Sequence, residues 1–575
     1  MSKIVLVCLR APTPPRMEAT RHHLERFLES LRPDNLVNAP TAIADDGRGL
    51  FVGIFNPVAG ALHECSAYAG WLIDGRERWW EPLTPVPEGS FALFRSDDER
   101  IEVFADYAGS RTIWIAKTDE LFVASMSQRA IPWFLGSFEP NPRAITWMLS
   151  SGSLGAGQSW DRRAQPLGPG GSARLDRRTW KLELDNPPAT FRIDPVTDVV
   201  HTSRMRTALH ETFAALDLDR SKWVLPLSGG HDSRAILLLM QAREGLKCIT
   251  WGLRESLSMP GTDAFIARKV ADFLGLSHQY FETDLTDLPA DRILERFLVA
   301  GEGRVDKISA YMDGFELWGS LFVGGTVGII RGDHGFGHRV ISNADEARLR
   351  VGLTLWSDLR DVPTLAALNL QHLGPQLLPP ALEQQPAESA STWRDRLFHA
   401  FRIPSVYGAL NELKSPYVEI VSPLFVRRIV ELARSHPGNL RTGKRLWRDL
   451  AAEVSIPVGY ADAHATANLD KALGHPSIME VLLDEISSNR THEILSSDFA
   501  SFVARRLLQP SNPRRGSSRY AALKRVVKNV LPKQLTASLV RGPDWRTLSA
   551  KRLALRVFLI SRMTERLQRD AQAIH

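Results

Sequence analysis

Residues 228–233 read Ser-Gly-Gly-His-Asp-Ser, which is the composition of a loop that holds an anion. A strand-like segment at 223–227 precedes the loop, and a helical pattern at 233–242 follows it. The two glycines let the backbone approach a ligand closely, the helix N-terminus offers free N–H groups, and the serines add hydroxyl donors. Such a loop suits pyrophosphate. Because Asp232 cannot itself neutralise a phosphate, we expect it to hold Mg²⁺; the alternative is that it only caps its own turn.

The elements around this loop place further residues at the same site. From about residue 200, strand-like and helical segments alternate, which predicts a parallel α/β sheet with strands at 247–251, 278–282 and 327–330. Ligands of open α/β sheets bind at the carboxyl ends of the strands, so we expect adenine to lie against the end of the 247–251 strand. The loop is not a Walker A motif, because no GxxxxGK run occurs. The predicted nucleotide-binding residues are Leu227, Ser228, Gly229, Gly230, Asp232, Ser233, Arg234, Trp251, Gly252 and Gly332.

The SGGxDS pattern resembles the PP-loop of ATP pyrophosphatases, which cleave ATP to AMP and pyrophosphate in order to adenylate a substrate. Residues 329–337, Ile-Ile-Arg-Gly-Asp-His-Gly-Phe-Gly, resemble the second metal-binding segment of class B asparagine synthetases, which reads Asp-Glu-Leu-Phe-Gly after a buried strand. The resemblance implies that Asp333 is the second Mg²⁺ ligand, and it puts His334 where that family has Glu.

Two later segments extend the resemblance. Residues 443–448, Gly-Lys-Arg-Leu-Trp-Arg, resemble the family's Lys-x-x-Leu-Arg helix start, which implies that Lys444 contacts phosphate and the reaction intermediate. Residues 418–423 resemble its Val-Glu-x-Arg-x-Pro segment. The candidates for the base that takes the proton of the attacking amine are Glu412, Glu419 and His334, and for His334 a purely structural, hydrogen-bonded role is preferred.

The first 190 residues also follow the order of that family's glutaminase-like domain. Short strand-like runs at 4–7, 90–94, 101–104, 112–115 and 121–124 and one amphipathic helix between Met17 and Leu31 indicate a β-rich unit. The glutamine-dependent enzymes begin, after Met1, with a catalytic Cys, whereas position 2 here is Ser. We therefore expect an Ntn-type αββα sandwich without its nucleophile, and an amine that does not come from glutamine.

The expected organisation is an α/β protein in three parts. Residues 1–190 form the inactive glutaminase-like scaffold, 196–500 a PP-loop ATP-pyrophosphatase domain with a parallel sheet, and 501–575 a basic helical C-terminal extension. Two segments that resist assignment, 374–391 and 459–476, are interpreted as mobile loops over the site.

The absence of the catalytic Cys also reduces the number of activities that the resemblance allows. β-Lactam synthetases and lasso-peptide macrolactam synthetases share this loss, and the runs at 306–314 and 331–333 resemble lasso cyclases most. The resemblance implies ATP and Mg²⁺ as cofactors, a leader-cleaved precursor peptide as substrate, and a leader peptidase and a leader-binding protein as partners. The reaction would join an Asp or Glu side chain of the peptide to its N-terminal amine. Alternatives are an asparagine synthetase or β-lactam synthetase-like ligase, a tRNA-modifying PP-loop ligase, and a binding protein that lost the chemistry.

Composition excludes several other classes of protein. The chain has 575 residues, of which 44% are hydrophobic and 24% charged, which is typical of globular proteins of more than one domain. No apolar run reaches the roughly 18 residues that a membrane span needs, and the first apolar run is too short for a signal peptide. The three cysteines match neither a disulfide framework nor a zinc site, so a reduced, cytoplasmic protein is expected.

Charge is concentrated at the C-terminal end of the chain. Residues 501–575 hold 17 Lys and Arg against three acidic residues, about +14, whereas the whole chain carries only +6. This segment could hold an acidic partner, a nucleic acid or a membrane surface, or it could be a solvated helical face. Binding of nucleic acid is not the expected role, because tRNA-modifying ligases of this type usually open with the PP-loop, and here about 220 residues precede it.

Overall fold

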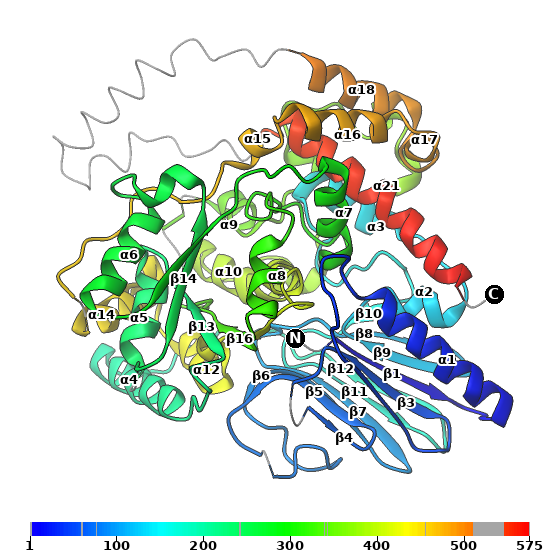
Figure 1. The fold of residues 1–575 in the computed structure, drawn as a ribbon, viewed down its shortest axis with the longest axis horizontal. Coiled ribbons are helices and arrows are strands. Elements are labelled where there is room, and N and C mark those ends of the chain that lie inside the picture. The colour runs from blue at the N-terminus through cyan, green and yellow to red at the C-terminus, as the bar shows by residue number, and fades with distance from the viewer. Residues whose placement is uncertain are drawn as a thin grey trace.

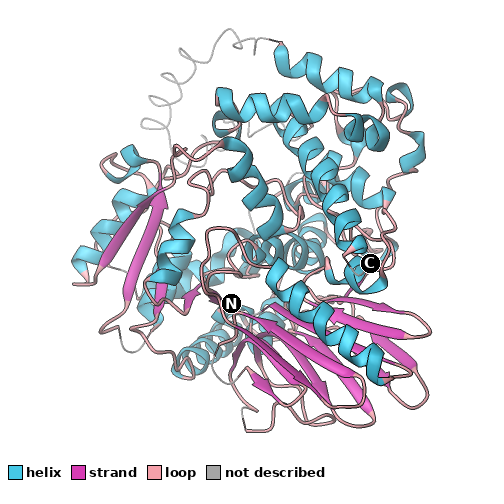
Figure 2. Ribbon diagram, turned by 45° about the vertical axis from the view of Figure 1, so that its right-hand side comes forward, coloured by secondary structure: helices cyan, strands magenta, loops and turns pink. Residues whose placement is uncertain are grey.

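The computed structural model describes residues 3–58, 61–75, 77–240, 243–337, 340–341, 343–454, 456–509 and 546–573. The protein is of mixed α/β class. Two antiparallel sheets of six strands each come from the first 185 residues, and a separate parallel sheet of five strands comes from residues 223–421 (Figures 1 and 2). Among the described residues, no helix combines the length and the hydropathy needed to cross a bilayer.

The two antiparallel sheets pack on one another through a shared apolar core. The strands of the first, in spatial order, are β10 (Gln165–Pro166), β8 (Trp114–Lys117), β9 (Leu121–Ser125), β1 (Lys3–Leu9), β3 (Leu50–Phe55) and β2 (Thr41–Asp45). Those of the second are β12 (Lys181–Asp185), β11 (Ser172–Asp176), β7 (Arg100–Ala105), β6 (Gly89–Ser96), β5 (Ser66–Leu72) and β4 (Leu62–His63). The predicted strands are all present, although the one expected at 112–115 begins at Trp114.

The outer faces of these two sheets are covered differently. Helix α1 (Pro14–Ser30) lies on β3 of the first sheet, as the amphipathic pattern predicts. On the second sheet, Phe91 and Leu93 face outward and pack with Trp79 from the loop between β5 and β6. The fully buried Arg95 fixes this loop by donating hydrogen bonds to the carbonyl oxygens of Trp79, Thr84 and Pro85 at 2.6, 2.9 and 3.1 Å. An aromatic loop therefore covers part of the face where the αββα expectation puts helices.

The parallel sheet carries the predicted anion loop. Its strands, in spatial order, are β15 (His278–Glu282), β14 (Lys247–Gly252), β13 (Trp223–Pro226), β16 (Gly328–Ile330) and β17 (Glu419–Val421). Its neighbouring helices include α4 (Asp198–Ala214), α5 (His231–Leu239), α6 (Asp263–Phe273), α12 (Arg427–Ser435) and α14 (Arg445–Glu453). Thr262 caps α6 by accepting the backbone N–H of Phe265, as the sequence predicts. Helix α5 begins two residues earlier than expected, and residues 241–242 of its predicted end lie outside the described residues.

Further helices surround the sheets. They are α2 (Ala130–Leu135), α3 (Pro142–Ser151), α7 (Ala290–Gly301), α8 (Glu316–Val323), α9 (Ala344–Val351), α10 (Ala390–Leu397), α11 (Gly408–Glu412), α13 (Gly438–Arg441), α15 (Leu469–Ala472), α16 (Pro476–Ile486), α17 (Asn489–Leu495), α18 (Ser497–Leu508) and α21 (Ala550–Gln572). A π-helical segment, Phe398–Tyr407, joins α10 to α11.

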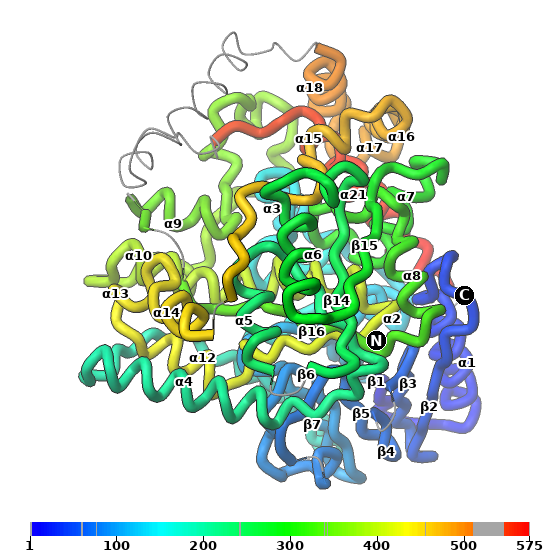
Figure 3. Tube along the Cα trace, turned by 60° about the vertical axis from the view of Figure 1, so that its left-hand side comes forward, coloured from blue at the N-terminus to red at the C-terminus, as the bar shows by residue number. Residues whose placement is uncertain are grey.

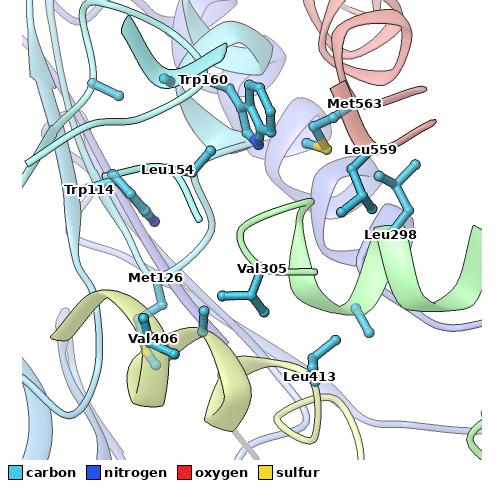
Figure 4. Close-up of a cluster of buried hydrophobic side chains, with 14 of the residues drawn as sticks. Trp114, Met126, Leu154, Trp160, Leu298, Val305, Val406, Leu413, Leu559 and Met563 are labelled. Carbon is cyan, nitrogen blue, oxygen red and sulfur yellow. The ribbon is translucent and has the colours of Figure 1, made fainter. Parts of the chain in front are cut away.

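The described end of the basic C-terminal segment is a central part of the structure and not an appended extension. Helix α21 packs against α2 and α3 of the first unit and against α7, α16 and α18 (Figure 1). Its Leu559 and Met563 lie beside Trp160 and Leu298, which come from these two different parts of the chain (Figure 4). All five arginines of the helix form ion pairs, so neither a solvated face nor a free basic patch describes it. Residues 510–545 of the same segment lie outside the described residues.

One buried ion pair of α21 gives a stability test. Arg556 Nε donates to Asp306 Oδ2 at 2.8 Å, and both side chains are almost completely buried. Arg556→Met is expected to lower the free energy of unfolding by about 3 kcal/mol, because Asp306 then keeps only Lys307 as a counter-charge in a buried site. Arg569→Met, on the same helix but in an exposed pair with Glu565, is expected to cost less than about 0.5 kcal/mol. Urea denaturation of both variants measures the difference; equal costs would contradict a structural role for the buried pair.

Two buried histidines predict sensitivity to mild acid. Burial, and then Arg434, lower the pKa of His399, and burial, and then His201, lower the pKa of His436 to about 3. Both rings are therefore neutral in the folded protein but protonated below about pH 6.5 in the unfolded chain. Stability is present above pH 6.5 and lost as the pH falls below it, by up to about 1.4 kcal/mol per pH unit for each histidine. Melting temperatures between pH 7.5 and 5 measure the loss, and His399→Gln is expected to flatten the curve.

Candidate functional site

The loop Ser228–Ser233 lies at the carboxyl end of β13 and leads into the first turn of α5, with Gly230 as the N-cap residue. The side chains of the two serines hold it in shape. Ser228 donates its backbone N–H to Ser233 Oγ at 2.9 Å, the two hydroxyls are 3.0 Å apart, and Gly230 donates its N–H to Ser228 Oγ at 3.2 Å. The sequence assigns the hydroxyls of Ser228 and Ser233 to a phosphate. In the structure these hydroxyls also hold the conformation of the loop before helix α5, which is nine residues long.

Asp232, in the first turn of α5, is the centre of a polar cluster. Its Oδ2 accepts from Lys444 Nζ at 3.0 Å, and its Oδ1 accepts from Trp447 Nε1 at 2.8 Å. His334 Nε2 lies 3.3 Å from the same Oδ2. His334 Nδ1 accepts the backbone N–H of Phe336 at 3.2 Å, which leaves Nε2 facing Asp232 and Lys444. The sequence therefore brings Asp232, His334 and Lys444 together from three distant segments, as predicted.

Charge decides the protonation state of Asp232. Burial alone raises the pKa of Asp232, but the hydrogen bond from His334 and the charges of His334 and Lys444 outweigh it and hold the pKa well below its usual value. Lys444 Nζ also lies 2.8 Å from His334 Nε2, so the ammonium contacts both the carboxylate and the imidazole. Asp232 is an anion at any physiological pH.

Asp333 lies across the pocket from this cluster, just after β16. Arg331, two residues earlier, pairs with both of its oxygens at 3.2 and 3.3 Å. A pocket of about 300 Å³ separates the two aspartates, which is at the small end of the range for ligand sites. Its lining consists of Pro226, Leu227, Ser228, Asp232, Ser233, Thr250, Trp251, Asp263, Arg331, Gly332, Asp333, Ala465 and Thr466. A peptide substrate implies a wide cleft over the loop, whereas the described residues form this smaller pocket there.

The donor set of this pocket fits Mg²⁺ together with a polyphosphate. Asp232 and Asp333 supply two carboxylates, and Mg²⁺ is commonly held by one or two carboxylates plus phosphate oxygens. Lys444 and Arg331 add positive charge beside them, and the N-terminus of α5 adds its free N–H groups. Among the described residues no group of three or more His, Cys, Asp or Glu could hold a metal without such a ligand.

Three glycines predicted to touch the nucleotide make close packing contacts instead. A Cβ on Gly229 would lie 2.5 Å from Ala461 Cβ, and one on Gly252 would lie 2.5 Å from the carbonyl oxygen of Ala465. Gly332 packs on the backbone at the start of α5, where a Cβ would be 3.3 Å from Ser233 N. A Cβ would collide with the Ala461 side chain at Gly229 and with backbone at Gly252, whereas Gly332 is only tightly packed and is the one of the three that also lines the pocket.

Arg234 is placed differently from the prediction. Its guanidinium points to the segment after α14, donating to the carbonyl oxygens of Val458 and Gly459 at 2.6 and 2.7 Å and stacking on Tyr460 at 4.1 Å. It does not line the pocket, so its role is to hold this segment against α5.

The same segment is not a free loop. Ala461 donates its N–H to Gly229, Ala463 pairs with Thr262, and Leu253 donates to Ala465, so the chain runs alongside α6 (Figure 3). Ala465 and Thr466 of this segment line the pocket. The other stretch expected as a mobile loop, 374–391, is also packed elsewhere: Gln376 donates to Ser150 Oγ at 2.8 Å, away from the anion loop.

Two of the proposed bases do not lie at the loop. Glu419 is the first residue of β17. It therefore lies at the end of the parallel sheet where the strands begin, and there it pairs with Arg111. Glu412 is buried at the end of α11 and pairs with Arg304. In a parallel sheet the amino and carboxyl ends of a strand face opposite edges, so Glu419 cannot share the pocket of Asp232. Of the three candidates, only His334 reaches the cluster.

The structure adds residues that the sequence did not identify. Trp447 binds Asp232 and lies one turn after Lys444 in the same helix start, so the helical spacing was the available signal. Arg331 pairs with Asp333, and both residues lie just after the carboxyl end of β16. Lys444 itself has a left-handed backbone, φ 58°, directly after Gly443 at φ 67°. A lysine held in this conformation costs about 1 kcal/mol, and such strain is found mostly at functional positions.

Comparisons with known proteins leave the chain without an assigned family. No protein-family model and no curated protein matches it. Among solved structures, one similar chain is a glutamine phosphoribosylpyrophosphate amidotransferase from B. subtilis complexed with ADP and GMP. It is 9% identical, with a TM-score of 0.20, and the match covers 48% of this chain and 65%, less than two thirds, of that one. At this level of similarity the neighbour supports no conclusion about fold or chemistry.

Proposed function

We propose that the protein is an ATP-dependent, AMP-forming ligase that makes an amide bond. The observation that carries the proposal is the pocket at the carboxyl edge of the parallel sheet, where the Ser-Gly-Gly-His-Asp-Ser loop, Asp333 and Lys444 meet. In its finer form the substrate is a leader-cleaved precursor peptide, whose Asp or Glu side chain is adenylated and then attacked by the peptide's own N-terminal amine. That finer form rests on the resemblance of the motifs to lasso-peptide cyclases.

The residues of the pocket suit both halves of such a reaction. In the first, a substrate carboxylate attacks the α-phosphorus of ATP and pyrophosphate leaves; the loop hydroxyls, the N-terminus of α5 and Arg331 stabilise the leaving charge. Mg²⁺, held by Asp232 and Asp333, would supply charge compensation for the pyrophosphate. In the second, the amine attacks the acyl carbon and AMP leaves. Lys444, already oriented by Asp232, stabilises the oxyanion and the AMP phosphate.

The test is product analysis with ATP, MgCl₂ and a precursor peptide encoded beside the gene, after removal of its leader. The expected products are AMP and pyrophosphate in equal amounts and a peptide lighter by one water. Hydroxylamine is expected to trap the acyl-adenylate as a hydroxamate, and a peptide with Gln or Asn at the acceptor position is expected to give neither product. Formation of ADP, or adenylation that needs tRNA and no peptide, would overturn the proposal.

A further inference from the structure

A second large pocket, formed by described residues, lies away from the anion loop, between the antiparallel sheets and the end of the parallel sheet where its strands begin. Its volume is about 900 Å³, at the upper end of the range for ligand sites. One wall comes from the β3–β4 connection, β5 and the β5–β6 loop of the first unit. The other comes from the starts of β13, β16 and β17 of the parallel sheet and the segments just before them. The pocket therefore exists only where the two units meet.

Aromatic side chains make up much of its wall. They are Tyr68, Trp71, Trp79, Trp80, Trp223, Phe322 and Tyr417. Trp79 and Trp80 are perpendicular to one another, and Trp80 stacks on His63 at 4.0 Å between ring centroids. Flat electron-rich faces of this kind attract cations, and guanidinium groups in particular stack on them.

The charges in the lining are mainly negative. Asp217, Asp219 and Glu419 line the pocket against a single lysine, Lys222, whose ammonium is 3.3 Å from Asp219. Glu419, only 1% exposed, receives Arg111 on Oε1 from behind the wall. Its Oε2 has no hydrogen-bond partner among the described residues. A buried carboxylate oxygen without a partner is costly, and a ligand donor in the pocket would remove that cost.

We propose that this pocket binds an organic cation, namely a guanidinium group carried on a peptide. The guanidinium stacks on the tryptophan faces and donates to Glu419 Oε2, while Asp217 and Asp219 at the rim add long-range attraction. The site is separate from the anion loop, because its strand ends are at the opposite edge of the sheet. Binding there requires neither ATP nor a metal, so it can be tested independently of the ligase reaction.

The experiment uses the full chain without nucleotide and titrates it with Nα-acetyl-arginine amide by calorimetry, with tryptophan fluorescence in parallel. Nα-acetyl-citrulline amide, which has nearly the same shape but no charge, is the matched ligand. We expect saturable binding of the arginine derivative, with at least about tenfold weaker binding of the citrulline derivative. Glu419→Gln, which keeps the acceptor for Arg111, is expected to weaken arginine binding about fivefold or more.

Trp80→Leu is expected to weaken binding as well, and because Trp80 is partly exposed at the rim, this variant tests the pocket even if Glu419→Gln fails to fold. Asp194→Asn, which removes an exposed carboxylate that pairs with Arg204 and does not line this pocket, is the control and is expected to bind as the parent does. Equal binding of arginine and citrulline derivatives, no saturation at 20 mM or so, or unchanged binding in both pocket variants would each overturn the proposal.

Discussion

Asp232→Asn is expected to lower the rate of ATP conversion to AMP by about 10³-fold or more, about 4 kcal/mol of transition-state stabilisation. The substitution keeps an oxygen that can accept Trp447 Nε1–H, so the fold around α5 is retained. It removes the negative charge that Lys444 and His334 now share, and with it the proposed hold on Mg²⁺. Measuring AMP release at saturating ATP and MgCl₂ gives the rate, and the loss of the MgATP-dependent rise in melting temperature gives an independent readout.

Two results would contradict this role for Asp232. One is AMP release within about tenfold of the parent rate, which is too small a loss for a group that holds the metal. The other is an equal loss in Asp194→Asn, whose carboxylate forms an exposed ion pair far from the loop and is expected to have no effect. A melting temperature close to that of the parent shows that a lost rate does not come from unfolding.

Lys444→Met is expected to lower amide formation by about 10²- to 10³-fold, the range found when one charge-stabilising donor is removed from an active site. Methionine fills the same space without the charge, so Asp232 loses the ammonium that pairs with it and the intermediate loses its stabilising group. The hydroxamate assay separates the two half-reactions. We expect adenylate to form and accumulate relative to amide, because Lys444 is assigned mainly to the second step.

The backbone of Lys444 sharpens this test. Because the residue is left-handed, Lys444→Gly is expected to gain about 1 kcal/mol of stability while losing the same activity as Lys444→Met. A variant that is more stable and less active would show that the strain is retained for function. Arg445→Met, the next residue, is the matched control: its weak pair with Asp449 is exposed, and we expect the parent rate. Loss of activity in the control would mean that the helix start, and not the ammonium, matters.

The sequence predicted most of the helices and strands around the site, but it predicted the contacts of fewer of the site residues. Short β-branched and aromatic runs placed β1, β6, β7 and β9, and a strand–glycine–helix run placed the anion loop, because these features are local in the chain. The convergence of Asp232, His334 and Lys444 came from motif resemblance, and the geometry agrees with it. The membership of the chain in the asparagine synthetase family, the lasso-peptide substrate and the use of ATP stay predictions.

What the sequence missed depends on tertiary contacts. The sequence around Arg234 does not indicate that its guanidinium binds Val458, and the sequence around Gly229 does not indicate that Ala461 leaves no room for a side chain there. In both cases the partner is more than 200 residues away in the chain. Glu419 was a candidate base because it belongs to the segment that resembles Val-Glu-x-Arg-x-Pro. The sheet topology shows that it lies at the amino ends of the parallel strands, whereas Asp232 lies at their carboxyl ends. The basic composition of residues 501–575 concealed the apolar stripe of α21, since charge was counted over the whole segment.

Helix α21 has a consequence for biosynthesis. It is translated after every element that it packs against, yet it fills the junction between the first unit and the helices around α16. A nascent chain can form the sheets earlier, but the apolar surface that Leu559 and Met563 later cover stays open to water until the ribosome has finished that helix. Chaperones that shield such surfaces are expected to associate with the nascent chain late, and a stop codon before residue 550 is expected to yield aggregated protein although all three described sheets are complete.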